Sequence, residues 1–310
     1  ENSGWDFSVS YTEQSNEFKW KVDAVASIVD NEVTSLGADE SASIFGENFQ
    51  NTGAAQTRAA VGQPIGHYFG LRTDGIYQTQ AEVDADNARA AQLTGDPGAT
   101  RQGTDVGPGD IRYQDINGDG VVTGEDRENI GHYLPDFTLG LNTTMSYKNF
   151  DLAMNWQGSF GFENLHSNRY YTEGMTRLFN MGTQVLDAWT PTNTNTTIPR
   201  TFGVNPETGA REARQANAVL SDRWVEDGDF VRLQFVTLGY TFPELRDSPF
   251  SKLRLYAQAQ NLLTFTGYTG YNPEVQGRVS NANDALFSQG VDDSTIPVPT
   301  TLILGLEIAF

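Results

Sequence analysis

The sequence predicts an all-β protein that forms part of a large antiparallel transmembrane β-barrel with long extracellular loops. Runs of about 9–13 residues alternate apolar and polar side chains, as strands with two unlike faces do. Aromatic residues make up 11% of the 310 residues and glycines number 31, a mixture that suits large β-structures with many turns. No stretch comes near the roughly 20 consecutive apolar residues of a membrane-spanning helix, so a membrane would have to be crossed by strands.

Two strands are expected at the start of the chain, at residues 5–12 and 17–29. In the first, Phe7, Val9 and Tyr11 alternate with serines, and the second repeats this pattern with lysines on its polar side. The chain opens at Glu1 without a Met or a signal peptide, so we expect it to be a piece of a longer protein.

The alternation is lost over residues 31–64 and returns over residues 66–77, which we expect to form a strand. Residues 82–91 are rich in alanine and predict a short helix. A carboxylate-rich turn follows at residues 115–126.

The clearest hairpin comes next. Residues 137–147 and 150–157 alternate over their full lengths and are separated only by Lys148 and Asn149. Two long strands joined by two residues form a tight β-hairpin.

After a long polar region at residues 160–228, alternation resumes at 229–242. Its apolar side changes phase after Phe235, which predicts a β-bulge. Strands at 253–259 and 302–310 bring the expected total to about eight.

The layout of these strands separates a barrel from a compact soluble domain. Transmembrane strands need about 9–11 residues, and outer-membrane barrels pair short periplasmic turns with long external loops. In a compact soluble domain, structureless loops longer than about 15 residues would count against the assignment.

Ten short segments stand out along the chain: GQPIGHYFG (62–70), DGIYQ (74–78), PGDIRYQDINGDG (108–120), DRENIG (126–131), YKNFDL (147–152), VEDGDFVRL (225–233), LGYTFP (238–243), QNLLT (260–264), YNPE (271–274) and LGLEIAF (304–310). Each is weak alone, but their order over nearly the whole chain is specific. Together they resemble the C-terminal region of the SusC/RagA family of TonB-dependent outer-membrane transporters. The step from Ile296 to Pro297 stands where that family often has Tyr-Pro.

The resemblance implies that residues 1–310 are the C-terminal portion of a barrel of about 22 strands with a plugged lumen. Residues 31–135 and 160–228 would then be mostly extracellular loops, and the plug domain and TonB-contacting segment would lie outside this sequence. The implied function is active import of oligosaccharides or peptides across the bacterial outer membrane. The implied partners are TonB, outer-membrane lipid and a SusD-like surface lipoprotein that captures the glycan or peptide.

The last strand carries an expectation of its own. Leu306, Ile308 and Phe310 lie on its apolar side, and similar barrels present such a terminal aromatic strand to the outer-membrane insertion machinery. The resemblance therefore implies that these residues are a membrane-insertion signal. The alternative is an ordinary amphipathic strand that happens to be last.

The sharpest chemical motif is the turn at residues 115–126. Its oxygen-bearing groups stand at the spacing of EF-hand ligands: Asp115, Asn117, Asp119, the Val121 carbonyl and Asp126. Gly120 takes the turn position, and Asp replaces the usual final Glu, as in dockerin-type loops. Such hard oxygen ligands suit Ca²⁺ better than Zn²⁺, so the motif predicts a Ca²⁺ loop that stiffens an external segment. The alternative is a metal-free Asn-Gly-Asp-Gly turn held by bonds between side chains and backbone.

Other candidate sites are weaker. His67, His132 and His166 lack ligand spacing and are expected to be isolated loop or surface residues. Asp227 and Asp229 are expected to be solvated loop acids rather than a glycosidase pair. The loop aromatics could stack on sugars or contact a partner, or could pack within the loops or a barrel-interface girdle: Tyr170, Tyr171, Trp189, Tyr268 and Tyr271.

Composition excludes several classes of function. The net charge of −20 argues against a nucleic-acid partner, and the absence of Cys excludes thiolate metal sites and Cys nucleophiles. No nucleophile elbow or phosphate-binding loop is present, so we expect no enzyme. The alternative function is a secreted, Ca²⁺-stabilised β-sandwich that binds glycans, whose strands would be shorter and would meet a second sheet.

Overall fold

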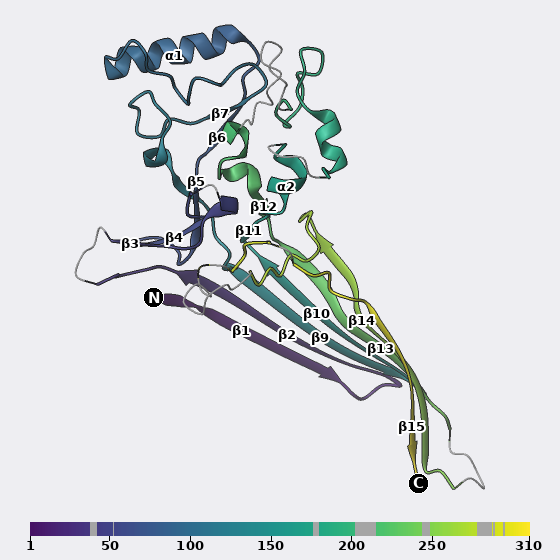
Figure 1. Ribbon diagram of the computed structural model, residues 1–310. Coiled ribbons are helices and arrows are strands. Elements are labelled where there is room, and N and C mark those ends of the chain that lie inside the picture. Colours follow the sequence, from purple (N-terminus) through teal and green to yellow (C-terminus); the bar gives the residue numbers. More distant parts are fainter. Residues whose placement is uncertain are drawn as a thin grey trace.

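Seven long strands form one antiparallel sheet in the computed structural model, which describes residues 1–37, 42–51, 53–175, 180–201, 215–243, 249–277, 287, 289–293 and 295–310. Their order in the sheet is their order in the chain: β1 (Asn2–Glu13), β2 (Phe18–Asn31), β9 (Phe137–Tyr147), β10 (Phe150–Phe160), β13 (Phe230–Thr241), β14 (Lys252–Thr266) and β15 (Thr301–Ala309). Figure 1 shows this sheet as a long inclined band, with the shorter elements gathered beyond its upper end.

The pairing register places apolar residues on one face of the sheet and polar residues on the other. Directly opposed residues of antiparallel strands share a face, so a row of partners can be followed from strand to strand. One row, from β2 to β15, is Phe18, Tyr147, Phe150, Tyr240, Leu255 and Leu306. A row on the opposite face is Lys21, Thr144, Ala153, Thr237 and Gln258. We call these two surfaces the apolar face and the polar face.

Short turns join the strands at one end of the sheet. The hairpin between β9 and β10 has the predicted two-residue turn, and Lys148 takes the left-handed conformation that such a turn requires, with φ of 53°. The predicted bulge is also present, because the register of β13 shifts between Leu233 and Phe235 against both neighbouring strands.

The long connections form a second body at the other end, which we call the end body. It contains three small sheets, built from β3 (Ser43–Phe45), β4 (Thr57–Ala60), β5 (His67–Gly70) and β8 (Glu128–Gly131), from β6 (Thr73–Ile76) and β7 (Ile111–Tyr113), and from β11 (Glu163–Leu165) and β12 (Val225–Asp227). Its helices are α1 (Gln80–Thr94), α2 (Arg169–Glu173) and the 3-10 turns η1 (Phe49–Asn51), η2 (Gly124–Asp126), η3 (Thr183–Asp187), η4 (Gln215–Ala218) and η5 (Asp222–Trp224).

The helix predicted at residues 82–91 is confirmed as α1, which is somewhat longer. Thr79 begins it with a capping box, in which its hydroxyl accepts from the backbone of Glu82 and the Glu82 side chain accepts from the backbone of Thr79. Gly95 ends it in the left-handed conformation at φ 74°.

The hydrophobic core lies in the end body, not against the long sheet. Its larger cluster is centred on buried side chains that include Phe49, Tyr68, Leu220 and Trp224, all outside the seven long strands. Side chains of the apolar face are open instead, for example Trp5 at 72% and Leu304 at 84% exposure. A secreted sandwich would bury these residues against a second sheet, so the described structure does not favour that alternative.

Two expectations about strands need correction. The long sheet has seven strands rather than about eight, because residues 66–77 form two short strands, β5 and β6, in separate small sheets. The aromatic residues of this segment pack into the end body, where Tyr68 and Tyr77 are buried, so its alternation reflected a local core. Residues 38–41, 52, 176–179 and 202–214 of the two predicted extracellular loops lie outside the described residues.

Candidate functional site

The apolar face carries aromatic residues near both ends of its strands. Near the short turns, the rings of Phe150 and Tyr240 are 4.8 Å apart and those of Tyr11 and Trp20 are 4.9 Å apart. Near the end body, Phe137 stacks on Phe160 at 5.7 Å. Aliphatic residues predominate between these ends, for example in the row of Val22, Thr143, Met154, Val236, Ala259 and Leu302, in which Thr143 is the polar member. An apolar band between two aromatic belts is the surface that a barrel presents to lipid.

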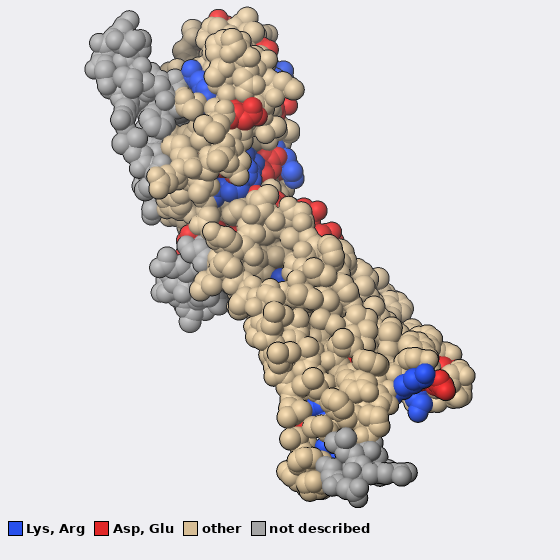
Figure 2. Space-filling model, turned by 90° about the vertical axis from the view of Figure 1, so that its right-hand side faces the viewer, with Lys and Arg blue, Asp and Glu red and all other residues tan. Residues whose placement is uncertain are grey.

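Charged residues are concentrated away from this band. Figure 2 shows Lys, Arg, Asp and Glu gathered over the end body and near the opposite tip, with almost none on the sheet surface between them in that view. Within the described ranges, no helix combines the length and apolar character needed to cross a membrane.

The polar face holds ion pairs that cross between strands. Arg254 of β14 donates to Asp151 of β10 with two hydrogen bonds of 3.0 and 2.5 Å. The strand between them, β13, has Gly239 at this point, and a Cβ there would lie 2.5 Å from both side chains. A polar surface of this kind suits water on that side of the sheet.

A cavity of about 710 Å³ lies between the polar face and the connection from β14 to β15. Arg232 of β13 donates to Asn272 over 2.8 Å and pairs with Glu274, so it ties this connection to the sheet. A cavity of this size, lined by both polar and apolar side chains, is large enough for a small ligand.

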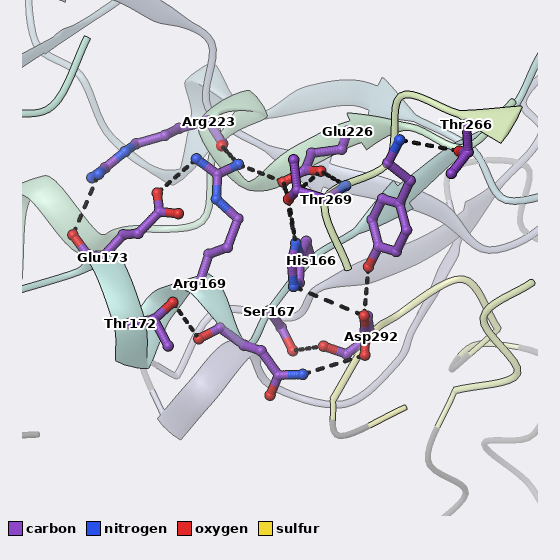
Figure 3. Close-up of polar contacts among 12 residues, drawn as sticks. His166, Ser167, Arg169, Thr172, Glu173, Arg223, Glu226, Thr266, Thr269 and Asp292 are labelled. Atoms are coloured by element: carbon purple, nitrogen blue, oxygen red, sulfur yellow. Dashed lines mark hydrogen bonds and ion pairs between the residues drawn. The ribbon is translucent and has the colours of Figure 1, made fainter. Parts of the chain in front are cut away.

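A network of charged groups holds the middle of the end body together (Figure 3). Arg169 of α2 donates to Glu226 of β12 over 2.9 Å and to Glu173 over 2.8 Å. His166 lies 3.1 Å from Glu226 through Nδ1 and 3.9 Å from Asp292 through Nε2. Residues from three distant segments therefore meet at one place.

The electrostatics of Glu226 follow from these contacts. Burial would raise the pKa of Glu226, but hydrogen bonds from His166 and Thr269 and the charge of Arg169 outweigh it and lower the pKa to about 2. Tyr268 donates to Asp292 over 2.5 Å, and burial together with this bond raises the pKa of Tyr268 well above its usual range. The arrangement thus stabilises the ionised form of Glu226 and the neutral form of Tyr268.

A second buried carboxylate anchors the part of the end body around β7. Asp110 accepts two bonds from Arg200, of 2.8 and 2.5 Å, and one from Asn217 of 2.9 Å. A buried carboxylate with this many donors fixes the segments that supply them.

The turn at residues 115–126 is held by bonds from its own backbone. Asp115 accepts from Gly118 and Gly120 over 2.8 and 2.9 Å, and Asp119 accepts from Val121 over 2.8 Å. The fully buried Asp126 accepts from Ile116, Asn117 and Thr123. In the part of the chain that the structure describes, no three His, Asp or Glu side chains are grouped so as to hold a metal ion. Ca²⁺ binding by this turn stays a prediction.

The terminal strand β15 lies at one edge of the sheet. Leu306 and Ile308 share the apolar face with their β14 partners, Leu255 and Leu253. Phe310 is 86% exposed, and its ring lies 5.3 Å from that of Phe250. The residues predicted as an insertion signal therefore form one apolar stripe along the edge.

Two of the three histidines, His67 and His166, do not match their prediction as isolated loop or surface residues, whereas His132 is a partly exposed loop residue. His67 is 2% exposed and lies within β5, and His166 belongs to the network around Glu226. Both depend on contacts between distant segments, which periodicity along the chain does not reveal. Asp227 and Asp229 are turn acids, since Asp227 accepts from the backbone of Asp229.

Most of the predicted loop aromatics pack inside the end body. Tyr170, Trp189 and Tyr268 are 5–8% exposed, whereas Tyr271 is 74% exposed. Tyr271 lines a cavity of about 560 Å³ together with Tyr171 and His166. The rings of Tyr170, Trp189 and Tyr268 are too buried to stack on a ligand, whereas the exposed ring of Tyr271 can do so.

Comparison with known proteins gives relatives along the whole chain. No protein-family model matches. The TonB-dependent receptor P3 of Formosa agariphila is 32% identical over 313 residues, covering 100% of this chain and 29% of the receptor. The TonB-dependent receptor SusC of Bacteroides thetaiotaomicron is 23% identical over 100% of this chain and 26% of SusC. The solved structure of the RagAB peptide transporter has a TM-score of 0.70 at 20% identity and covers 100% of this chain and 29% of its own.

The resemblance to the SusC/RagA family is confirmed.

The SusC/RagA-like chain spans less than a third of the length of these curated relatives. TonB-dependent receptors such as SusC and RagA are outer-membrane proteins, so the predicted location in the bacterial outer membrane is confirmed. The relatives are receptors and a transporter rather than enzymes, in agreement with the expectation of a non-enzyme.

Proposed function

We propose that the full-length protein is a TonB-dependent importer of oligosaccharides or peptides that works with a SusD-like surface lipoprotein. The observation that carries the proposal is the unlike pair of faces on the seven-stranded sheet, one apolar and exposed, the other polar. An apolar face suits lipid and a polar face suits a water-filled lumen. Similarity to TonB-dependent receptors over the whole chain supports this reading.

The proposed barrel has about 22 strands, of which this chain supplies the seven strands of the long sheet. In that sheet β1 and β15 are the two edges, and edges do not persist in lipid because their backbone groups lack partners. Strands from the rest of the protein would pair with both edges and close the barrel. The plug domain and the TonB-contacting segment would come from the rest of the protein as well.

The end body fits the extracellular side. The described residues of 31–135 and 160–228 belong to it almost entirely, and the short turns lie at the opposite end of the sheet (Figure 1). Outer-membrane barrels keep short turns on the periplasmic side and long loops outside. The proposed SusD-like lipoprotein would therefore contact the end body.

Uptake by living cells tests the import proposal. Cells that carry the full-length protein should accumulate labelled oligosaccharides or peptides, and cells without functional TonB should not. Pull-down of the protein should recover a surface lipoprotein. Equal uptake with and without TonB for every probe would contradict the proposal.

We also propose that Leu306, Ile308 and Phe310 serve as the membrane-insertion signal. The support is their common apolar stripe on an edge strand and the exposed ring of Phe310. Removing Phe310 should lower the amount of protein in the outer membrane several-fold, as measured by quantitative blotting of membrane fractions. Thr301→Ala at the other end of the same strand is the control and should have no such effect.

We further propose that the turn at residues 115–126 binds Ca²⁺ through the five predicted oxygen groups. Support comes from their EF-hand spacing and from Gly120 at the turn position, whose φ of 94° favours glycine. Calorimetric titration of Ca²⁺ into the full-length protein should release or absorb heat, and the Asp119→Asn variant should bind Ca²⁺ more weakly. The absence of heat at millimolar Ca²⁺ would leave the metal-free turn as the correct reading.

A further inference from the structure

A cavity of about 300 Å³ lies in the end body between β6, β7 and the segments around α2 and η5. The charged residues that line it are both cations, Arg169 and Arg223. The remaining lining residues are small, hydroxyl-bearing or apolar: Thr73, Gly75, Ile76, Ile111, Thr196, Thr197 and Ile198. No carboxylate of the described residues lines this cavity. Other arginines of the end body, such as Arg101, Arg169 and Arg200, are paired with carboxylates.

Arg223 differs from its neighbour Arg169 in its partners. Arg169 is paired with Glu173 and Glu226. Among the described residues, Arg223 donates to two backbone carbonyls, those of Asn217 at 3.1 Å and Glu173 at 3.4 Å, and it lies over the ring of Trp224 at 4.5 Å. Figure 3 shows its guanidinium turned away from Glu226 and His166. Within the described ranges, no carboxylate lies within ion-pair distance of Arg223.

A partly buried cation without a counter-ion is unfavourable unless something else neutralises it. Burial lowers the pKa of Arg223 to about 10, which reflects this cost while leaving the group charged at neutral pH. The carboxylate next in the chain, Asp222, is occupied elsewhere, because the backbone N–H and the hydroxyl of Thr73 donate to it over 3.0 and 2.8 Å. Arg223 therefore has unused N–H groups at a cavity with no anion of its own.

We propose that this cavity binds a carboxylate group of the imported substrate, an inference that rests on the import function proposed above. Arg223 would donate to the two carboxylate oxygens, a geometry that suits the planar guanidinium. Thr196 accepts from the backbone of Ile198 over 3.0 Å, so its own hydroxyl hydrogen is free to donate to the ligand. Ile76 and Ile111 provide an apolar wall beside the charged group.

Two classes of substrate carry such a carboxylate. One is a peptide with a free C-terminus, and the other is an oligosaccharide that contains a uronic acid. A cavity of about 300 Å³ is at the lower limit for ligand pockets, so it suits one terminal residue or one sugar unit rather than a whole substrate.

The first experiment leaves the protein unchanged and alters the probe. Calorimetry on the purified full-length protein compares trigalacturonate with its methyl ester, and an apolar tripeptide with its C-terminal amide. We expect at least tenfold tighter binding of the charged member in one of the two pairs, and that pair identifies the source of the carboxylate. Equal binding within both pairs, or no binding of either charged probe, would overturn the inference.

The second experiment tests Arg223 itself. In Arg223→Gln the tenfold preference for the charged probe should fall to about twofold or less. Arg223→Lys should retain part of this preference, because Lys keeps the positive charge but lacks the planar guanidinium that donates two parallel hydrogen bonds. Arg89→Gln is the matched control, since Arg89 is an exposed cation on α1, and the preference should persist there. A preference that survives Arg223→Gln in a folded protein would overturn the assignment to this cavity.

These measurements separate the inference from the proposed function. Binding is measured without TonB, so a failure of cellular uptake with intact carboxylate preference would count only against import. If cells with Arg223→Gln take up an acidic probe normally and the variant also binds it unchanged, the result would count only against the carboxylate site.

Discussion

Glu226 connects three segments of the end body that are far apart in the sequence. His166 and Arg169 reach it from the segment after β10, and Thr269 reaches it from the segment after β14, donating through its backbone N–H over 2.9 Å. Because all of these contacts favour the carboxylate, a single residue couples the assembly of these segments to pH.

The stability of the end body should therefore depend on pH through Glu226. Its pKa falls from 4.5 to about 2 on folding, so its contribution is complete above pH 4.5 and is lost as the pH falls from there towards 2. The contribution is on the order of 3 kcal/mol at most, since each pKa unit corresponds to about 1.4 kcal/mol. Thermal unfolding of the full-length protein should show Glu226→Gln less stable than the wild type at pH 7, with the difference shrinking by pH 3.

Glu17→Gln serves as the control, because Glu17 is an exposed acid in the turn between β1 and β2. It should match the wild type at every pH. A difference between Glu226→Gln and the wild type that stays constant from pH 7 to pH 3 would contradict the proposed linkage.

Strand β13 shows how one small residue lets its neighbours interact. Asp151 of β10 and Arg254 of β14 pair across β13, and Gly239 leaves the space that this pair occupies. The side chains belong to strands that are not adjacent, so the pair also fixes how the three strands lie relative to one another.

A double-mutant cycle tests this role of Gly239. Asp151→Asn alone should destabilise the protein by about 1 kcal/mol, because it breaks the ion pair on the polar face. Gly239→Ala should displace the pair, so Asp151→Asn should cost almost nothing further in that background. The measurement is heat-induced unfolding followed by gel mobility, and fully additive effects would show that the two sites are independent.

The whole molecule is a sheet with two unlike surfaces that carries a separately packed body at one end. The sheet contributes no residue to the two hydrophobic clusters of the end body, so its apolar face needs another partner. In the proposed barrel that partner would be lipid, which accounts for the exposure of Leu238 and its apolar neighbours.

Two neighbouring positions on β13 should respond oppositely to a charge. Leu238→Arg places a cation on the apolar face and should destabilise the protein by about 2 kcal/mol. Thr237→Arg places the same cation on the polar face and should be tolerated within about 0.5 kcal/mol. Unfolding of the protein from lipid vesicles measures both, and an equal cost at the two positions would contradict the assignment of the faces.

Much of the fold followed from local pattern. Alternation located all seven long strands, the turn at Lys148 and the bulge near Phe235, and alanine-rich composition located α1. The segment at residues 66–77 was misread because two short strands that pack into a local core also alternate. The Ca²⁺ spacing at residues 115–126 was visible in the sequence and still awaits a test.

The sequence by itself determined the strands and their two faces. Residues two positions apart in a strand lie on the same face, so the pattern can be recognised from a short stretch of sequence. Only the tertiary structure decided that His166, Glu226 and Asp292 meet and that no carboxylate of the described residues pairs with Arg223. Such contacts join residues tens of positions apart, and their geometry depends on how the long connections fold over the end of the sheet.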